Sequence, residues 1–96
     1  MIEYLADAEN ILAYLNNAAH SHFKFRNPKG VLTATAVLII TRLKDGYSPT
    51  ELREVVFFKT EEWRADKLMQ KYLRPATLFG KRKFEQYRGA IGPTDE

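Results

Sequence analysis

The 96-residue sequence contains no cysteine. This absence excludes a disulfide framework and a zinc site built on thiolates, and nothing in the sequence argues for an oxidising compartment. Long apolar runs are also missing, since the longest, Ala36–Ile40, is far too short to span a bilayer. The N-terminal MIEYLADAE is acidic where a signal peptide would be basic. We therefore expect a cytoplasmic protein that is neither exported nor inserted in a membrane.

Recognisable catalytic patterns are absent too. There is no G-x-S-x-G, no glycine-rich phosphate loop, and no motif that pairs a histidine with a nucleophile. His20 and His22 form a His-Ser-His pair, which is a weak metal site without a nearby cysteine or carboxylate. The Glu61-Glu62 pair is better explained as the solvent side of a helix than as an acid/base couple. The sequence predicts no enzyme activity, no metal and no cofactor.

What is present indicates a small helical domain. The 45% hydrophobic fraction suits one packed core, which we expect over about residues 7–88, with a loose tail at 89–96. Asp7 is a candidate cap for a first helix whose apolar residues recur at helical spacing. Val31–Lys44, closed by Gly46, has β-branched residues typical of a strand, but its length favours a helix.

The second half of the sequence contains clearer signals for the starts and ends of helices. Ser48-Pro49-Thr50-Glu51 predicts a helix start with a capping box, and we expect Phe57 and Phe58 to extend its apolar side. A short helix is expected over 67–73, because the residue before Pro75 is disfavoured in helical geometry. Pro75 then begins another turn, and a last helix covers 81–88. The predicted fold is all-α, a compact single-domain bundle of about four to five short helices.

Positive charge is concentrated in the last third of the chain. Residues 63–88 contain eight cationic side chains and two carboxylates, a net charge of +6, whereas the whole chain carries +3. A second basic block lies near residue 24, and a face uniting both blocks would suit phosphates. Simple solvation of helix surfaces is the competing interpretation. The candidate DNA-binding residues are Lys67, Lys71, Arg74, Lys81, Arg82, Lys83, Arg88, Lys24, Arg26 and Lys29.

Aromatic residues are interleaved with these cations. Trp63 is expected in the core, because a large ring stabilises a small domain strongly. The rings around Pro75 are expected to form a packed corner, and a ring exposed beside Lys71, Arg74 and Lys81 could stack on single-stranded DNA. Phe57 and Phe58 are adjacent on one helix, so at least one is a candidate for a partner-binding patch, with burial of both as the alternative.

Several of these residues together resemble a known family. Tyr14-Leu15-Asn16, Arg42 to Gly46, Lys59 with Glu62-Trp63, the run from Lys71 to Gly80, and Phe84 to Tyr87 are similar to the conserved phage C-terminal domain of phage and prophage replisome organisers. The resemblance covers about residues 11–87. Its structural signature comprises Tyr14, Leu15, Trp63, Tyr72, Leu73, Pro75, Leu78, Phe79, Gly80, Phe84 and Tyr87.

The resemblance implies a role in replication initiation inside a bacterial host. Such proteins are related to DnaD-like helicase loaders, which bind origin DNA and help bring the replicative helicase onto it. The leading hypothesis is an accessory domain that binds single-stranded or opened origin DNA with little sequence preference. The alternative is a module that docks the helicase or sister subunits through Phe57 and Phe58 without touching DNA. A regulator that places a helix in the major groove of duplex DNA is the third interpretation.

Overall fold

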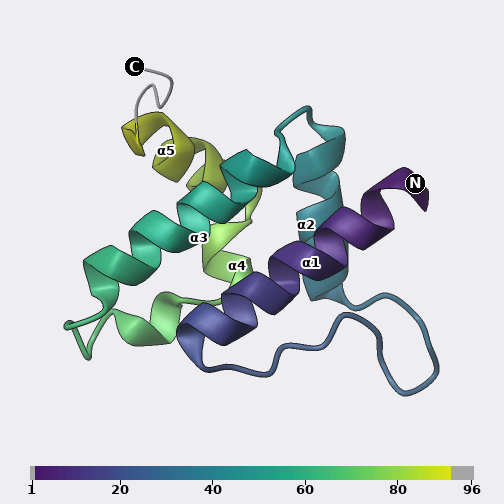
Figure 1. The fold of residues 1–96 in the computed structure, drawn as a ribbon, viewed down its shortest axis with the longest axis horizontal. Helices are drawn as coiled ribbons and strands as arrows, with labels where there is room; N and C mark the ends of the chain where they lie inside the picture. The colour runs from purple at the N-terminus through teal and green to yellow at the C-terminus, as the bar shows by residue number, and fades with distance from the viewer. Residues whose placement is uncertain (1, 92–96) are drawn as a thin grey trace.

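The computed structural model describes residues 2–91, with side chains from Tyr4 onward. Five α-helices and one short 3-10 helix follow one another along the chain (Figure 1): α1 (Ile2–Ala19), α2 (Ala34–Lys44), α3 (Pro49–Trp63), η1 (Gln70–Tyr72), α4 (Pro75–Leu78) and α5 (Lys81–Ile91). Over this part of the chain there is no strand, and an isolated antiparallel bridge joins Arg26 to Leu32. The predicted all-α bundle of four to five helices is confirmed.

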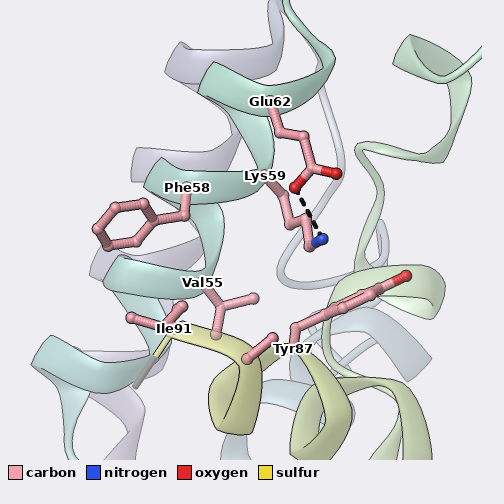
Figure 2. Close-up of a pocket in the computed structure, with 7 residues that line it drawn as sticks. Val55, Phe58, Lys59, Glu62, Tyr87 and Ile91 are labelled. Carbon is pink, nitrogen blue, oxygen red and sulfur yellow. Dashed lines mark hydrogen bonds and ion pairs between the residues drawn. The ribbon is translucent and has the colours of Figure 1, made fainter. Parts of the chain in front are cut away.

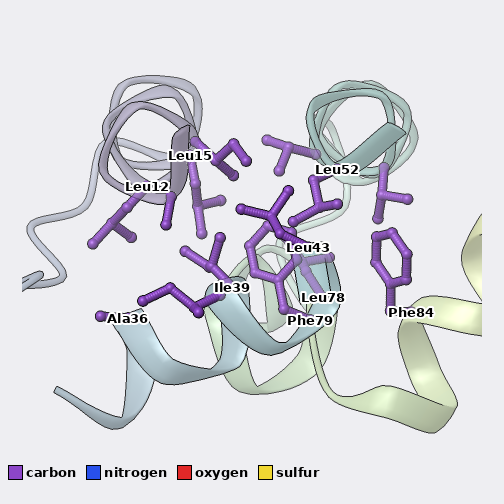
Figure 3. Packing of buried hydrophobic residues seen from close by; sticks show 14 of the residues in the cluster. Leu12, Leu15, Ala36, Ile39, Leu43, Leu52, Leu78, Phe79 and Phe84 are labelled. Atoms are coloured by element: carbon purple, nitrogen blue, oxygen red, sulfur yellow. The ribbon is translucent and has the colours of Figure 1, made fainter. Parts of the chain in front are cut away.

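The core lies where three helices meet. Figure 1 shows α1 and α3 side by side with α2 crossing behind α1, and Figure 3 shows α2 directing Ala36, Ile39 and Leu43 between the other two. Residues of α4 and α5 close the same cluster from one side. The side chains that solvent does not reach at all include Ile11, Leu15, Ile39, Leu52, Val55, Val56, Leu78, Phe79 and Phe84. Their burial stabilises the fold by roughly 1.5–3 kcal/mol for each large side chain.

The helices α2 and α3 begin where a side chain accepts hydrogen bonds from the free N–H groups of the first turn. At α3 the Ser48 hydroxyl accepts from the Glu51 N–H at 3.1 Å, and the Glu51 carboxylate accepts from the Ser48 N–H at 2.8 Å. The predicted capping box is therefore confirmed. The Val31–Lys44 element is a helix, as favoured, but it begins at Ala34. The reason is Thr33, whose hydroxyl accepts from the Ala36 N–H and donates to the Lys24 carbonyl.

The prediction that Asp7 caps the first helix is wrong. α1 already runs from Ile2, so Asp7 lies within its second turn. The physical reason is that the apolar stripe continues toward the N-terminus, where Tyr4 and Leu5 pack against the core beside the fully buried Ala8. Extending the helix buries this stripe, and the exposed Asp7 side chain remains on the solvent side.

The α-helix predicted over 67–73 is also wrong. Only the three residues of η1 are helical there, and they are 3-10 rather than α. The Asp66 carboxylate accepts from the Leu68 and Met69 N–H groups, which favours a tight turn after α3. Arg74, before Pro75, is extended at φ −146° and ψ 155°, so a helix could not continue past it.

The final helix is longer than expected. α5 continues through Gly89 to Ile91, and Ile91 packs partly against the core, so the loose tail does not begin at residue 89. The rest of the predicted tail, 92–96, lies outside the described residues. Within residues 2–91 no helix combines the length and apolarity needed to cross a bilayer.

Candidate nucleic-acid interface

The corner between α4 and α5 fixes the geometry of the candidate site. Leu78 and Phe79 are completely buried, and Phe79 packs against Phe84 of α5 with ring centres 6.3 Å apart. At Gly80 an added Cβ would lie 2.9 Å from the Ala76 carbonyl oxygen, a separation that real Cβ atoms essentially never show. The chain can therefore turn from α4 into α5 this tightly only with glycine at position 80.

A buried arginine attaches this corner to α2. Arg42 is 4% exposed. Its Nη1 donates to the Phe79 carbonyl at 3.4 Å, and its Nε lies 3.1 Å from the Asp45 carboxylate. A buried guanidinium needs such partners to offset its desolvation. Nothing in the sequence marks Arg42 as buried, because a cation near a helix C-terminus is normally solvated.

The start of α5 carries three exposed cations, Lys81, Arg82 and Lys83. No acidic residue lies in the first turn of this helix. The helix dipole is positive at this end, so these cations lie where the dipole disfavours positive charge, by roughly 0.3–1 kcal/mol each. A phosphate bound here would meet both the side-chain charges and the favourable end of the dipole.

Beside this basic turn lies an open groove bordered by the end of α3, η1, α4 and α5. Its lining consists of Trp63, Met69, Tyr72, Arg74, Thr77, Lys83 and Tyr87. Three of these side chains are aromatic and two are cationic, and none of the described residues that line the groove is acidic. The sequence indicated the cations and the aromatic residues, but not that residues 63, 72 and 87 share one surface.

Tyr72 is a half-buried ring of this groove, and two cations lie over it. The Lys71 Nζ is 5.3 Å and the Arg74 Cζ 5.4 Å from the ring centre, distances at which cation–π attraction operates. The Arg74 Nε also donates to the Thr77 hydroxyl at 3.1 Å. The structure thus places one partly exposed ring beside Lys71 and Arg74, two of the three cations considered for stacking on single-stranded DNA. The third, Lys81, does not line this groove and lies instead beside Arg82 and Glu85.

The other two rings of the groove have a different environment. Trp63 is only 6% exposed, as expected for a core residue, and it meets Tyr87 edge to face at 6.2 Å. Lys59 lies over both rings and is paired with Glu62 at 3.0 Å. Figure 2 shows Lys59 and Glu62 beside Tyr87 at a second, more apolar groove, which is also lined by Val55, Phe58 and Ile91.

The remaining candidate cations do not form one face. Lys67 is exposed on the turn after α3, whereas Lys24, Arg26 and Lys29 belong to the loop between α1 and α2. Figure 1 shows this loop on the opposite side of the molecule from α5, so the structure does not bring the two basic blocks together. Arg26 donates to the Gly30 carbonyl within the loop at 2.8 Å.

Arg88, also predicted to bind DNA, forms an ion pair in the structure. Its Nε lies 3.0 Å from a Glu51 carboxylate oxygen, so α5 is joined to the start of α3. The hydrogen bond from the Ser48 N–H, together with Arg88, holds the pKa of Glu51 below its usual value of 4.5, against a smaller opposing effect of burial. The ion pair between Arg88 and Glu51 therefore stabilises the packing of α5 against α3.

Phe57 and Phe58 do not extend the apolar side of α3, contrary to expectation. They are 47% and 44% exposed, and their rings meet each other edge to face with centres 5.3 Å apart. The reason is helix phase, since Leu52, Val55, Val56 and Trp63 already occupy the stripe that faces the core. The two rings instead form an exposed aromatic pair.

The His20 and His22 pair gains no third ligand. Among the described residues, no group of three or more histidine and acidic side chains could hold a metal ion. His20 ends α1 with a positive φ of 54°, and the side chain of Asn16 organises the turn by bonding both the N–H and the carbonyl of Phe23. These contacts give the segment a structural role.

Comparison with known proteins gives one result. A family model described as a conserved phage C-terminus matches residues 11–89. No curated protein and no solved structure matches the chain. The match includes α2 to α4, the basic start of α5 and all residues that line the groove.

Proposed function

The chain belongs to the conserved phage C-terminus family, and from this premise we propose that it is an accessory domain of a phage or prophage replication-initiation protein. In this role it binds DNA and assists loading of the replicative helicase in the bacterial cytoplasm. The observation that supports DNA binding is the basic start of α5 next to a groove with aromatic and cationic but no acidic lining. Such a surface attracts phosphates and releases counterions.

This surface is not expected to recognise a particular base sequence. Lysine and arginine side chains on a helix surface contact phosphates, which position a protein on DNA but carry no base information. The proposed function therefore predicts similar affinities for unrelated sequences and a steep loss of affinity with added salt.

Replacing Lys81, Arg82 and Lys83 together by glutamine tests the proposal. Binding of labelled DNA, measured by fluorescence anisotropy, should weaken for all sequences, and the salt dependence should become shallower. The matched control replaces Lys24, Arg26 and Lys29 by glutamine, which removes the same charge from the opposite side of the molecule (Figure 1). Equal losses in the two variants would mean that net charge alone, rather than the α5 face, governs binding.

A second function is favoured by a different observation. The exposed Phe57 and Phe58 pair is an apolar feature on the solvent side of α3, which suits docking of the replicative helicase or of sister subunits. Replacing both by serine should abolish helicase binding in a pull-down with the purified proteins and leave DNA affinity unchanged. If the double variant still binds helicase, docking through this pair is wrong.

A further inference from the structure

We infer that the groove lined by Tyr72, Arg74 and Lys83 takes an unpaired base of single-stranded DNA, which stacks on Tyr72 while Arg74 and Lys83 hold the neighbouring phosphates. The inference rests on the proposed DNA-binding function and adds the groove, the stacking ring and the phosphate contacts that would select the single strand. It concerns the groove surface rather than the exposed cations Lys81 and Arg82.

The composition of the groove supports this ligand. Aromatic faces stack on any base, and cations on the rim follow the backbone, which together are the usual elements of single-strand binding. The lining residues Arg74 and Lys83 supply positive charge on the α4 and α5 sides, and the described lining contains no carboxylate that would repel phosphate.

Tyr72 is the ring available for stacking. Trp63 is nearly buried, and Tyr87 is covered at 4.4 Å by Lys59, a cation that is itself only 16% exposed and is paired with Glu62. The cations over Tyr72 are exposed instead. Tyr72 is held by η1 at the groove wall and is partly exposed. The cations over it, from Lys71 and Arg74, are on flexible side chains at about 5 Å. They can move from the ring to phosphates when a base arrives, because both interactions need only positive charge.

Duplex DNA does not offer the same interaction. In a duplex the bases are paired and stacked on one another, so that only their edges are accessible in the grooves. Stacking on a tyrosine requires an unpaired base with a free face. We therefore expect the groove to distinguish opened DNA from duplex, even though both carry phosphates that the α5 cations would attract.

The chain carries its own reporter for this groove. Trp63 is the single tryptophan of the sequence, and it lines the groove. A base entering the groove should change the fluorescence of Trp63, whereas phosphate contacts at Lys81 and Arg82 should not. Titration with an oligothymidine, a duplex of equal length and an abasic oligonucleotide of equal charge should give a fluorescence change only with the oligothymidine.

Two sets of variants make the test specific. Tyr72→Leu should weaken oligothymidine binding by about 5- to 150-fold, the usual value of one stacked base. Tyr72→Phe keeps the ring and should bind as the unchanged protein does, which also controls for folding. Lys83→Gln should weaken single-strand binding more than Lys81→Gln, although both remove one charge from the same turn of α5, because only Lys83 lines the groove.

The possible results separate the two proposals. If DNA binds but Tyr72→Leu has no effect, Lys83→Gln equals Lys81→Gln, and duplex changes Trp63 fluorescence as much as oligothymidine does, the groove inference is wrong and the proposed function stands. If neither form of DNA binds at low salt, the proposed function fails, and the inference fails with it.

Discussion

The Lys59 ammonium lies 4.4 Å from the centre of the Tyr87 ring, so a cation of α3 packs directly on an aromatic residue of α5. Trp63 provides a second ring at 5.2 Å, and Glu62 pairs with the same ammonium. These contacts explain why Lys59, Glu62, Trp63 and Tyr87 occur together in the sequence pattern. They hold α5 against α3 and so shape one wall of the groove.

Removing this cation should destabilise the domain. Lys59→Met keeps most of the apolar stem but loses the attraction to the two rings and to Glu62. We expect the free energy of unfolding to fall by about 0.5–2 kcal/mol, the value of a partly desolvated cation–π contact. Urea denaturation followed by circular dichroism measures this change.

The control for Lys59 is Arg64, the residue that directly follows α3. Arg64 pairs with Glu61 at the same i,i+3 spacing, but both side chains are largely exposed. Arg64→Met should change the free energy of unfolding by less than about 0.5 kcal/mol. Equal effects of the two substitutions would show that the rings add nothing to the Lys59 contact.

Two glycines should respond in opposite directions to alanine. Gly80→Ala forces a Cβ to within 2.9 Å of the Ala76 carbonyl and should cost about 1–3 kcal/mol. Gly89 lies exposed in α5 with no atom within 4 Å of a Cβ, so Gly89→Ala should stabilise the helix by about 0.5–1 kcal/mol. Thermal unfolding of both variants checks the pair, and a stable Gly80→Ala protein would contradict the tight approach of α4 and α5.

The Glu51 carboxylate should make stability depend on pH. Its pKa in the folded state is lowered, first by the Ser48 N–H and then by Arg88, so its contribution is full above the unfolded pKa, near 4.5, and is lost as the pH falls through the folded value. Glu51→Gln can still form the capping box but has no charge for Arg88. The variant should be less stable by about 0.5–1 kcal/mol at pH 7.

The pH dependence distinguishes the loss of the Glu51–Arg88 ion pair from the effect of removing any carboxylate. The difference between the original protein and Glu51→Gln should shrink below about pH 4.5, as measured by urea denaturation at several pH values. Glu9→Gln changes an exposed carboxylate of α1 and serves as the comparison. A difference between Glu51→Gln and the original protein that stays constant down to pH 3 would exclude the assigned role of the Arg88 ion pair.

The sequence predicted the ends of helices correctly where the deciding residues are close together in the chain. Ser48 and Glu51 form the capping box that their spacing predicts, and Gly46 ends α2 with a φ of +107° that favours glycine. Pro75 likewise starts α4. In these cases the residues that decide the structure are within four positions of each other, so no tertiary contact is needed to interpret them.

The sequence did not predict the structure correctly where packing between distant segments decides which side chains are buried. Asp7 fits a cap or a solvent-facing helix position, and the burial of Ala8 decides between them. Phe57 and Phe58 are apolar enough for the core, but the phase of α3 leaves them outside. The groove depends on residues from 63 to 87 that meet only after folding, and Arg88 contacts Glu51 across 37 positions. Spacing along the chain does not indicate such contacts.

The most direct test of the central claim is fluorescence anisotropy of labelled single-stranded and duplex DNA with the purified domain at two salt concentrations. We expect micromolar binding at low salt that weakens steeply as salt is added, and stronger binding of the single strand. Absence of binding to both DNAs at low salt would contradict a DNA-binding role and leave docking through Phe57 and Phe58 as the function to pursue.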